Sequence, residues 1–256
     1  MRVYDNCREL MSEMGRNLGE MGSIVKPKTY QNKKIEGNED FITKELICEQ
    51  YCLVAMPDPD FLFYYDEASK PWAEAELKER LDEHNPTNPG EAWKIRRDLW
   101  EQFLVPTAKK ENQQFDYSYN ERIWAPVGFF SEKGNLRRII EELKDNPDTR
   151  QAVLMIHWPN DTAFIGGKRR VPCTMYYNFL IRKNGRGEDQ LNIVYHQRSS
   201  DFITHFGNDV WLAWKLMEFV AQEIGVQPGY LYHTIDSIHT YKKDWDQLKQ
   251  SISNPL

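Results

Sequence analysis

One strongly amphipathic stretch, residues 210–225, sets the first limit on what this chain can fold into. Its sequence VWLAWKLMEFVAQEIG spaces apolar residues as one face of a helix does, and it ends on Gly225, a residue type that often terminates helices. Before it come the apolar run LNIVY and then the polar segment HQRSSDFITHFGND, residues 196–209. The polar segment therefore lies where a strand hands over to a long helix. A surface turn is the simplest explanation for its charges, and a ligand site is the alternative.

Further helix and strand patterns surround this stretch. Residues 135–149 predict a helix that stops at a proline, and residues 150–158 predict a buried strand. Residues 174–199 predict two strands joined by a glycine-containing turn, and residues 229–241 predict another strand. Strands mixed with long helices indicate an α/β or α+β fold, in which a mixed β-sheet packs against helices as a single domain over residues 1–256.

The first half of the chain has weaker patterns. Residues 40–56 have apolar positions at roughly helical spacing, which predicts a helix that carries Glu49, with Cys48 and Cys52 on one face. Residues 57–115 are polar, charged and interrupted by prolines, with helix-like pieces. We expect a divergent helical insertion on the surface there, because its apolar residues are too sparse for a core of its own.

The composition excludes several classes of protein. Of the 256 residues 40% are hydrophobic, which is enough for a sizeable core and argues against a disordered or fibrous protein. The formal net charge of −6 is opposite to the basic surface that polymeric nucleic acid requires. A small phosphorylated ligand needs only a few local cations, so the composition remains compatible with such a partner.

No part of the sequence predicts a membrane or secretory protein. No apolar run approaches the roughly 18 residues of a membrane-spanning helix, and the N-terminus carries charges where a signal peptide needs an apolar block. We therefore expect a cytoplasmic protein without a membrane partner. The four cysteines lack the spacing of metal ligands, so neither disulfides nor a metal site are predicted.

Cys173 is the candidate nucleophile. It follows a proline at the start of a predicted strand, with Lys168, Arg169 and Arg170 close upstream. Nearby cations favour the thiolate form of a cysteine, which is the nucleophilic form. A packing role at the strand edge is the alternative, since no His/Asp pattern of a protease accompanies it.

Ordered motifs strengthen the catalytic interpretation of Cys173. Pro172-Cys173 is followed by Gln197-Arg198-Ser199-Ser200-Asp201, then by Asp209, and then by His239-Thr240-Tyr241. In this order they resemble the motifs of the thymidylate synthase family, and within it those of the phage deoxycytidylate hydroxymethylases. The resemblance runs over roughly residues 40–245 and is poor in the 57–115 segment.

Three further segments carry the same resemblance. LKDNPDTRQAVLMIHW (143–158) resembles the helix, turn and strand that bear phosphate-binding arginines, and YNERIW (119–124) resembles a tyrosine-containing segment. CEQYC (48–52) places Glu49 at the family's catalytic glutamate. The resemblance implies a thymidylate synthase-like fold.

The resemblance also implies a reaction and a co-substrate. Cys173 would add to carbon 6 of a pyrimidine, so that carbon 5 can attack the one-carbon unit of 5,10-methylenetetrahydrofolate. Glu49 would organise water and proton transfers at the base, and Tyr119 would order water near carbon 5. Asp201 would contact the folate ring.

The implied substrate is a pyrimidine deoxynucleoside monophosphate. Arg198 and Ser199 would bind its phosphate together with Arg150 of the partner subunit in a homodimer. The family has a second arginine where this chain has Gln151, and Arg169 or Arg170 are candidates to replace it. His239 and Tyr241 would bind the sugar hydroxyl. Gln197, the first residue of the motif that contains Arg198 and Ser199, is also assigned to substrate binding.

Position 209 decides which base is bound. Family members that act on uracil have asparagine there, because an amide both donates to O4 and accepts from N3–H. A carboxylate accepts from the exocyclic amine of cytosine and, when protonated, also satisfies N3. Asp209 therefore favours dCMP, whereas a shift of one residue to Asn208 would restore a uracil site.

The final step separates two reactions. A synthase methylates by hydride return from folate, and a hydroxymethylase adds water instead. Thr174 stands where synthases have histidine, and the chain ends 15 residues after Tyr241. Both features favour hydroxymethylation over methylation. Together with Asp209 they predict a dCMP 5-hydroxymethylase, in the host cytoplasm if the protein is viral. The alternatives are a dUMP hydroxymethylase, a thymidylate synthase and a non-catalytic nucleotide-binding protein.

Overall fold

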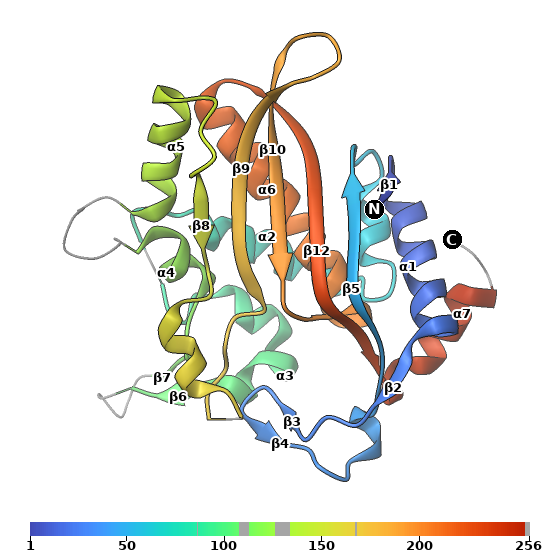
Figure 1. The fold of residues 1–256 in the computed structure, drawn as a ribbon. Coiled ribbons are helices and arrows are strands. Elements are labelled where there is room, and N and C mark those ends of the chain that lie inside the picture. The colour runs from blue at the N-terminus through green and yellow to red at the C-terminus, as the bar shows by residue number, and fades with distance from the viewer. Residues whose placement is uncertain (86, 108–112, 126–133, 167, 254–256) are drawn as a thin grey trace.

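A mixed eight-stranded β-sheet is the centre of the computed structural model, which describes residues 1–85, 87–107, 113–125, 134–166 and 168–253 (Figure 1). Its strand order is β1-β5-β12-β10-β9-β8, with β11 beside β12 and β2 beside β5. These strands are β1 (Arg2–Tyr4), β2 (Ser23–Val25), β5 (Thr43–Leu53), β8 (Val153–Met155), β9 (Thr174–Lys183), β10 (Asp189–Gln197), β11 (Ser200–Asp201) and β12 (Gln227–Tyr241).

The α-helices lie behind this sheet and beside its edges in a single α+β domain (Figure 1), which confirms the predicted fold class. They are α1 (Cys7–Met21), α2 (Ser69–Arg80), α3 (Arg97–Trp100), α4 (Tyr119–Trp124), α5 (Asn135–Asp145), α6 (Gly207–Ile224) and α7 (Trp245–Ser253). Two short ladders stand apart from the sheet, namely β3 (Thr29–Tyr30) with β4 (Lys33–Lys34) and β6 (Val105–Pro106) with β7 (Gln113–Gln114).

The middle of the sheet agrees with the sequence patterns. β9 and β10 are antiparallel across a turn in which Gly187 has φ of 80°, and β12 runs parallel to β10. Every second residue of β9 points into the core, namely Tyr177, Phe179 and Ile181. A parallel pair needs a crossover, and α6 supplies it between β10 and β12.

Helix α6 packs against β10 and β12 and ends where predicted, at Gly225 with φ of 79°. Its first residue is Gly207, and a Cβ atom there would lie 1.7 Å from the carbonyl oxygen of Leu62. A side chain at position 207 would therefore push the helix away from the segment Pro59–Phe63. This close approach holds the start of α6, and with it the polar segment 196–209, against the residues around Leu62.

The helix predicted over residues 40–56 is wrong. Residues Thr43–Leu53 form β5, which pairs with β12, β1 and β2, and Cys48 has a left-handed φ of 59°. Cys48 is exposed and Cys52 is buried, so they do not share a helix face. Pairing with strands far along the chain outweighed the local spacing of apolar residues.

The described part of the segment 57–115 contains α2, α3 and the ladder of β6 with β7, and it is not only a surface excursion. Its core residues are Leu62, Phe63, Trp72, Ala73, Ala92 and Phe103. The predicted strand 150–158 is also shorter than expected, since β8 covers only Val153–Met155 at the edge of the sheet. There Leu154 is buried, whereas Val153 and Met155 are exposed.

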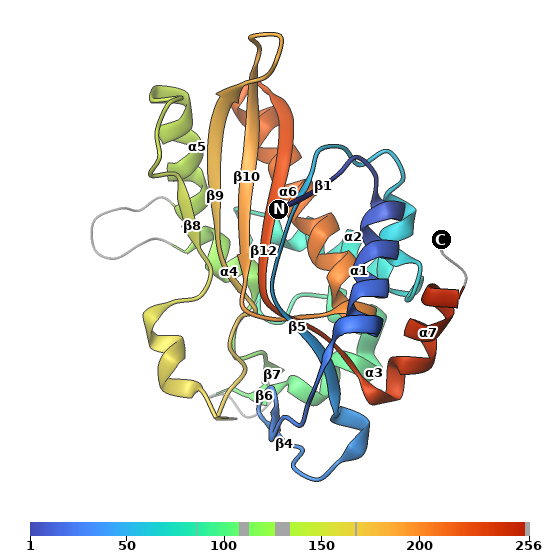
Figure 2. The same ribbon diagram turned by 45° about the vertical axis from the view of Figure 1, so that its right-hand side comes forward.

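The two faces of the sheet differ. Helices α6 and α2 lie behind it in Figure 1, and none of the drawn helices crosses the face toward the viewer, which Figure 2 shows from a second angle. By register this open face carries Met155, Tyr176, His196 and Thr234 in a row across four strands. Separately, in the described part of the chain no helix has the length and apolar character of a membrane span.

Candidate active site

A cavity of about 430 Å³ lies at the ends of the central strands where the polar junction meets α6. Eight of the twelve side chains predicted from the sequence line it: Tyr119, Cys173, Arg198, Ser199, Asp201, Asp209, His239 and Tyr241. The other four, Glu49, Arg150, Gln197 and Asn208, do not belong to its lining.

Cys173 and Arg198 are held together at the cavity. Arg198 donates from its backbone N–H to the carbonyl oxygen of Cys173 at 2.9 Å and from Nη2 to Sγ at 3.7 Å. The same guanidinium donates from Nε to the carbonyl of Pro172 and from Nη2 to that of Val171. The cation is therefore positioned beside the sulfur by the backbone that carries that cysteine.

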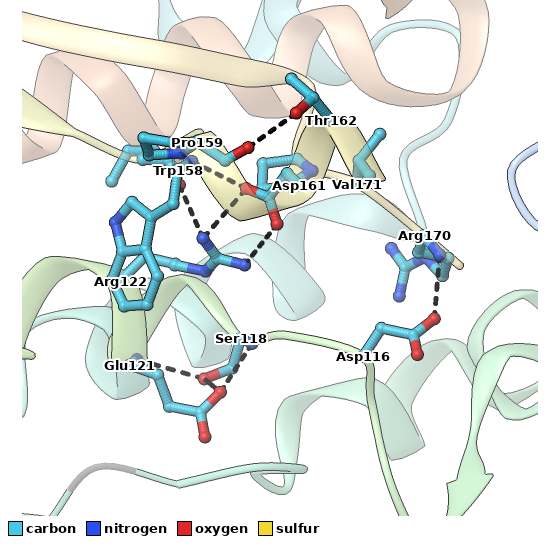
Figure 3. Close-up of polar contacts among 12 residues, drawn as sticks. Asp116, Ser118, Glu121, Arg122, Trp158, Pro159, Asp161, Thr162, Arg170 and Val171 are labelled. Atoms are coloured by element: carbon cyan, nitrogen blue, oxygen red, sulfur yellow. Dashed lines mark hydrogen bonds and ion pairs between the residues drawn. The ribbon is translucent and has the colours of Figure 1, made fainter. Parts of the chain in front are cut away.

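A buried ion pair fixes the segment that leads to Cys173. Arg122 of α4 donates two hydrogen bonds to Asp161, at 3.0 and 2.9 Å, and Asp161 also accepts from the backbone N–H of Trp158 (Figure 3). Further along, the backbone N–H of Arg170 donates to Asp116. These contacts tie the chain before Cys173 to α4, the helix that begins at Tyr119.

Asp209 lies at the first turn of α6 and faces the cavity. Its Oδ2 accepts from Gln197 Nε2 at 2.7 Å and from Ser200 Oγ at 3.1 Å, and burial raises its pKa to about 6. Gln197 thus stands behind Asp209 rather than in the cavity. Asn208 is buried away from the cavity and donates to the carbonyl of Thr204, so Asp209 and not Asn208 is presented to a ligand.

Strand pairing brings three more predicted residues to the same cavity. Asp201 on β11 is the register partner of His239 on β12, and Tyr241 follows two residues later. Burial raises the pKa of Asp201 to about 6 and lowers that of His239 to about 4. His239 is therefore neutral at pH 7 and able both to donate and to accept hydrogen bonds.

Helix α2 contributes charged residues that the sequence did not predict. Glu76 accepts from Arg80 Nε at 2.8 Å, and the Arg80 guanidinium lies 3.8 Å from the ring centroid of Tyr119. Glu79 accepts from the backbone N–H groups of Glu91 and Ala92, and burial raises its pKa. The spacing of Trp72, Glu76 and Arg80, four residues apart each time, was the signal that they share one helix face.

Glu49, the glutamate predicted from the sequence, does not line the cavity, although another glutamate of β5 does. Glu49 is half-buried on the strand and lies outside the lining, whereas Glu45 lines the cavity and accepts from Ser237 Oγ. Tyr119 hydrogen-bonds Thr174 Oγ1 at 3.2 Å, next to Cys173. Tyr119 and Arg80 therefore line the cavity on the side of α2 and α4.

The two candidates for an additional cation differ in surroundings. Arg170 is buried, with the rings of Trp100, Phe103, Phe115 and Tyr117 within 5.6 Å. Arg169 lines the cavity and is exposed, so it is freer to meet a phosphate. Arg150 is exposed just before β8 and lies outside the cavity of its own chain.

A thiol beside an arginine, buried carboxyl groups and aromatic walls in one cavity define an enzyme site for a small polar substrate. The sequence model of the thymidylate synthase family matches residues 87–255. The chain belongs to the thymidylate synthase family, whose members are one-carbon transferases.

Three relatives illustrate the range of this family. A protein of Methanosarcina mazei that carries the provisional name thymidylate synthase is 29% identical, over 63% of this chain and 69% of its own length. The deoxyuridylate hydroxymethyltransferase of Bacillus phage SP01 is 30% identical, over 51% of this chain and 35% of its own. The thymidylate synthase of Mycoplasma genitalium is 26% identical, over 48% and 40%.

Proposed function

We propose that the chain is a folate-dependent dCMP 5-hydroxymethylase. The observation that carries the proposal is the carboxyl group of Asp209 at the cavity, with the amide of Asn208 turned away from it. Protonated on one oxygen, this carboxyl group donates to N3 of cytosine and accepts from the exocyclic amine. The hydrogen-bonding pattern of uracil is the reverse at both positions, so Asp209 supports dCMP over dUMP.

The proposed reaction begins at Cys173. Its thiolate forms a bond to carbon 6 of the pyrimidine, and the electron pair moved to carbon 5 attacks the methylene carbon of 5,10-methylenetetrahydrofolate. Carbon 5 then loses its proton, and tetrahydrofolate leaves unoxidised from the methylene group. Water adds to the exocyclic methylene, the Cys173–carbon 6 bond breaks, and 5-hydroxymethyl-dCMP is released.

Glu76 takes the acid–base role that the sequence assigned to Glu49. Glu76 lines the cavity, its partner Arg80 lies against Tyr119, and Tyr119 hydrogen-bonds Thr174 beside the thiol. These contacts place the Glu76 carboxylate on the side of the cavity that Arg80 and Tyr119 line, which supports an acid–base role for it at the base. Glu79 is engaged by backbone N–H groups and fits a scaffold role better.

The phosphate and the folate complete the proposed complex. Arg198 and Ser199 bind the phosphate, Arg150 of the partner subunit adds a second arginine, and Arg169 replaces the cation missing at Gln151. The open sheet face supports a homodimer, because apolar side chains such as Met155 lie exposed on it. Asp201 contacts the folate ring, and His239 and Tyr241 bind the sugar hydroxyl. We place the reaction in the cytoplasm, that of the host if the protein is viral, where thiols stay reduced.

The second candidate acts on dUMP. The phage SP01 relative is named a deoxyuridylate hydroxymethyltransferase, and Arg80 offers a donor near Asp209 that suits O4 of uracil. In that case an ionised Asp209 would accept from N3–H. A thymidylate synthase would use the same scaffold with hydride return, whereas the cation fixed beside Cys173 argues against a purely nucleotide-binding protein.

One assay separates these functions. The purified protein is incubated with dCMP or dUMP tritiated at carbon 5, together with methylenetetrahydrofolate, and both tritium release and dihydrofolate absorbance are followed. Tritium release from dCMP without dihydrofolate supports the proposal. Release from dUMP alone assigns the second candidate, and dihydrofolate formation assigns a synthase. Nucleotide binding without release from either substrate would assign a binding protein.

A further inference from the structure

A chain of buried hydrogen bonds runs from Asp209 to the opposite side of the core. Gln197 Nε2 lies 2.7 Å from Asp209 Oδ2, and Gln197 Oε1 lies 3.0 Å from His233 Nε2. His233 Nδ1 lies 2.8 Å from the hydroxyl of Tyr51. Gln197, His233 and Tyr51 are at most 1% exposed, and the His233 ring stacks on Tyr195 at 4.2 Å. The three residues come from β10, β12 and β5, which are neighbours in the sheet.

The hydrogen bonds of this chain have one direction that satisfies every donor. Burial keeps His233 neutral by lowering its pKa to about 3, so only one ring nitrogen donates. If Nε2 carries the proton, Tyr51 donates to Nδ1, His233 donates to Gln197 Oε1, and the Gln197 amide donates to Asp209. If Nδ1 carried it, the Tyr51 proton would have no acceptor among its described contacts, and a buried donor without an acceptor is costly.

We infer that Tyr51 and His233 are positioning residues that decide which oxygen of Asp209 carries a proton. Because Gln197 is held as a donor, Oδ2 accepts from it and from Ser200, and the proton is left to Oδ1. In the described part of the chain no hydrogen bond to Oδ1 is formed, so Oδ1–H is the donor offered to N3 of cytosine. The inference deepens the proposed dCMP specificity and rests on it.

Few charged groups act on the residues of this hydrogen-bond series. Arg80 of α2 and Asp201 of β11 act electrostatically on Asp209, and His196 on the same strand as Gln197 acts on His233. Arg80 favours the ionised form of Asp209, whereas Asp201 opposes it. Neither group determines which of the two carboxyl oxygens is protonated, because both act on the charge of the whole group. The amide of Gln197 distinguishes the oxygens by direct contact.

The test compares Tyr51→Phe and His233→Phe with the wild-type protein. Both variants keep an aromatic ring at the position and remove the directional hydrogen bond, so Gln197 is free to turn its carbonyl toward Asp209. The ratio of kcat/KM for dCMP to that for dUMP should fall about tenfold, the equivalent of one net hydrogen bond. The matched control is Tyr4→Phe. Tyr4 is buried against Tyr51, but its hydroxyl donates to Glu13, which is not part of this series of hydrogen bonds. It should keep the wild-type ratio.

A fall in the ratio should depend on pH, which a general loss of packing would not produce. The ratio is measured between about pH 5 and about pH 8 in variants whose thermal unfolding shows them to be folded. An unchanged ratio in both folded variants would overturn the inference, and so would an equal fall in Tyr4→Phe. If both variants fail to fold, the tautomer measurement on the wild-type protein decides.

A nitrogen-15 NMR spectrum of the imidazole reports the His233 tautomer without any substrate. The inference requires protonated Nε2 and bare Nδ1, and the opposite tautomer would refute it. His233→Phe identifies the signal where it can be prepared, and otherwise the signal is identified by sequential assignment. Because this result needs no turnover, a protein that uses neither nucleotide would disprove the proposed function and still leave the hydrogen-bond direction decided.

Discussion

At the scale of single residues, Cys173 supplies the nucleophile in the proposed mechanism and is not one of the buried core residues. It is only half-buried, and its sulfur is contacted by the guanidinium of Arg198. Cys173→Ser should lower turnover at least about a thousandfold, because a serine hydroxyl is a weak nucleophile without a base beside it. Nucleotide affinity, measured by isothermal titration, should stay close to that of the wild type. Turnover near the wild-type rate would rule out the covalent mechanism.

Asp209, in contrast to Cys173, is proposed to select the base and not to react with it. Asp209→Asn places an amide at the cavity, and the ratio of kcat/KM for dCMP to that for dUMP should fall by about a hundredfold. Measurement of both constants on the two nucleotides checks this. A preserved preference for dCMP would mean that another residue reads the base.

The raised pKa of Asp209 gives the same residue a pH signature. Its carboxyl group is protonated below about pH 6, so kcat/KM for dCMP in the wild type should fall as the pH rises through that value. The sign for stability follows from the same pKa. A folded-state pKa above the unfolded one lowers the free energy of unfolding as the pH rises from about 4 to about 6. Asp209→Asn should therefore gain stability relative to the wild type over that range, as denaturant unfolding at several pH values would show.

At the scale of elements, the sequence pattern placed the cavity glutamate on the segment that forms β5, whereas the structure presents Glu76 from α2. β5 is a long paired strand, and Glu49 on it does not reach the cavity, whereas α2 presents Glu76 and Arg80 to it. Glu76→Gln should lower kcat about a hundredfold with a smaller change in KM, because a proton path is lost and phosphate binding is not.

Glu49→Gln is the matched control for this prediction, since the same substitution is made on the residue that the motif CEQYC suggested. It should leave tritium release and product formation close to wild-type rates. The reverse outcome, with Glu49→Gln inactive and Glu76→Gln active, would return the acid–base role to β5. Thermal unfolding of both variants shows whether the loss of the Arg80 partner disturbs α2.

At the scale of the whole molecule, sequence patterns predicted the features that residues close together along the chain determine. The hairpin of β9 and β10, the end of α6 at Gly225 and the cavity-lining motif from Arg198 to Asp209 all have local signals. β5 does not, because its stability comes from pairing with β12 nearly two hundred positions later. The spacing of Trp72, Glu76 and Arg80 places them on one face of α2, but only the packing of Trp72 into the core shows that this face turns inward.

The proposed homodimer belongs to the same scale. Arg150 is exposed outside its own cavity, next to the edge strand β8 of the open sheet face. If Arg150 of the partner subunit completes each phosphate site, Arg150→Glu and Cys173→Ser are each inactive but complementary. A heterodimer of the two variants would have one intact site, because the intact Cys173 meets the intact partner arginine.

Unfolding and refolding the two variants in equal amounts should recover about one quarter of the wild-type activity, since half of the dimers are mixed and each has one working site of two. The control mixes Cys173→Ser with Arg198→Ala. Arg198 contacts Cys173 within one chain, so no mixed dimer has an intact site, and no recovery is expected. Recovery in the control, or none in the first mixture, would mean that Arg150 does not act across a dimer.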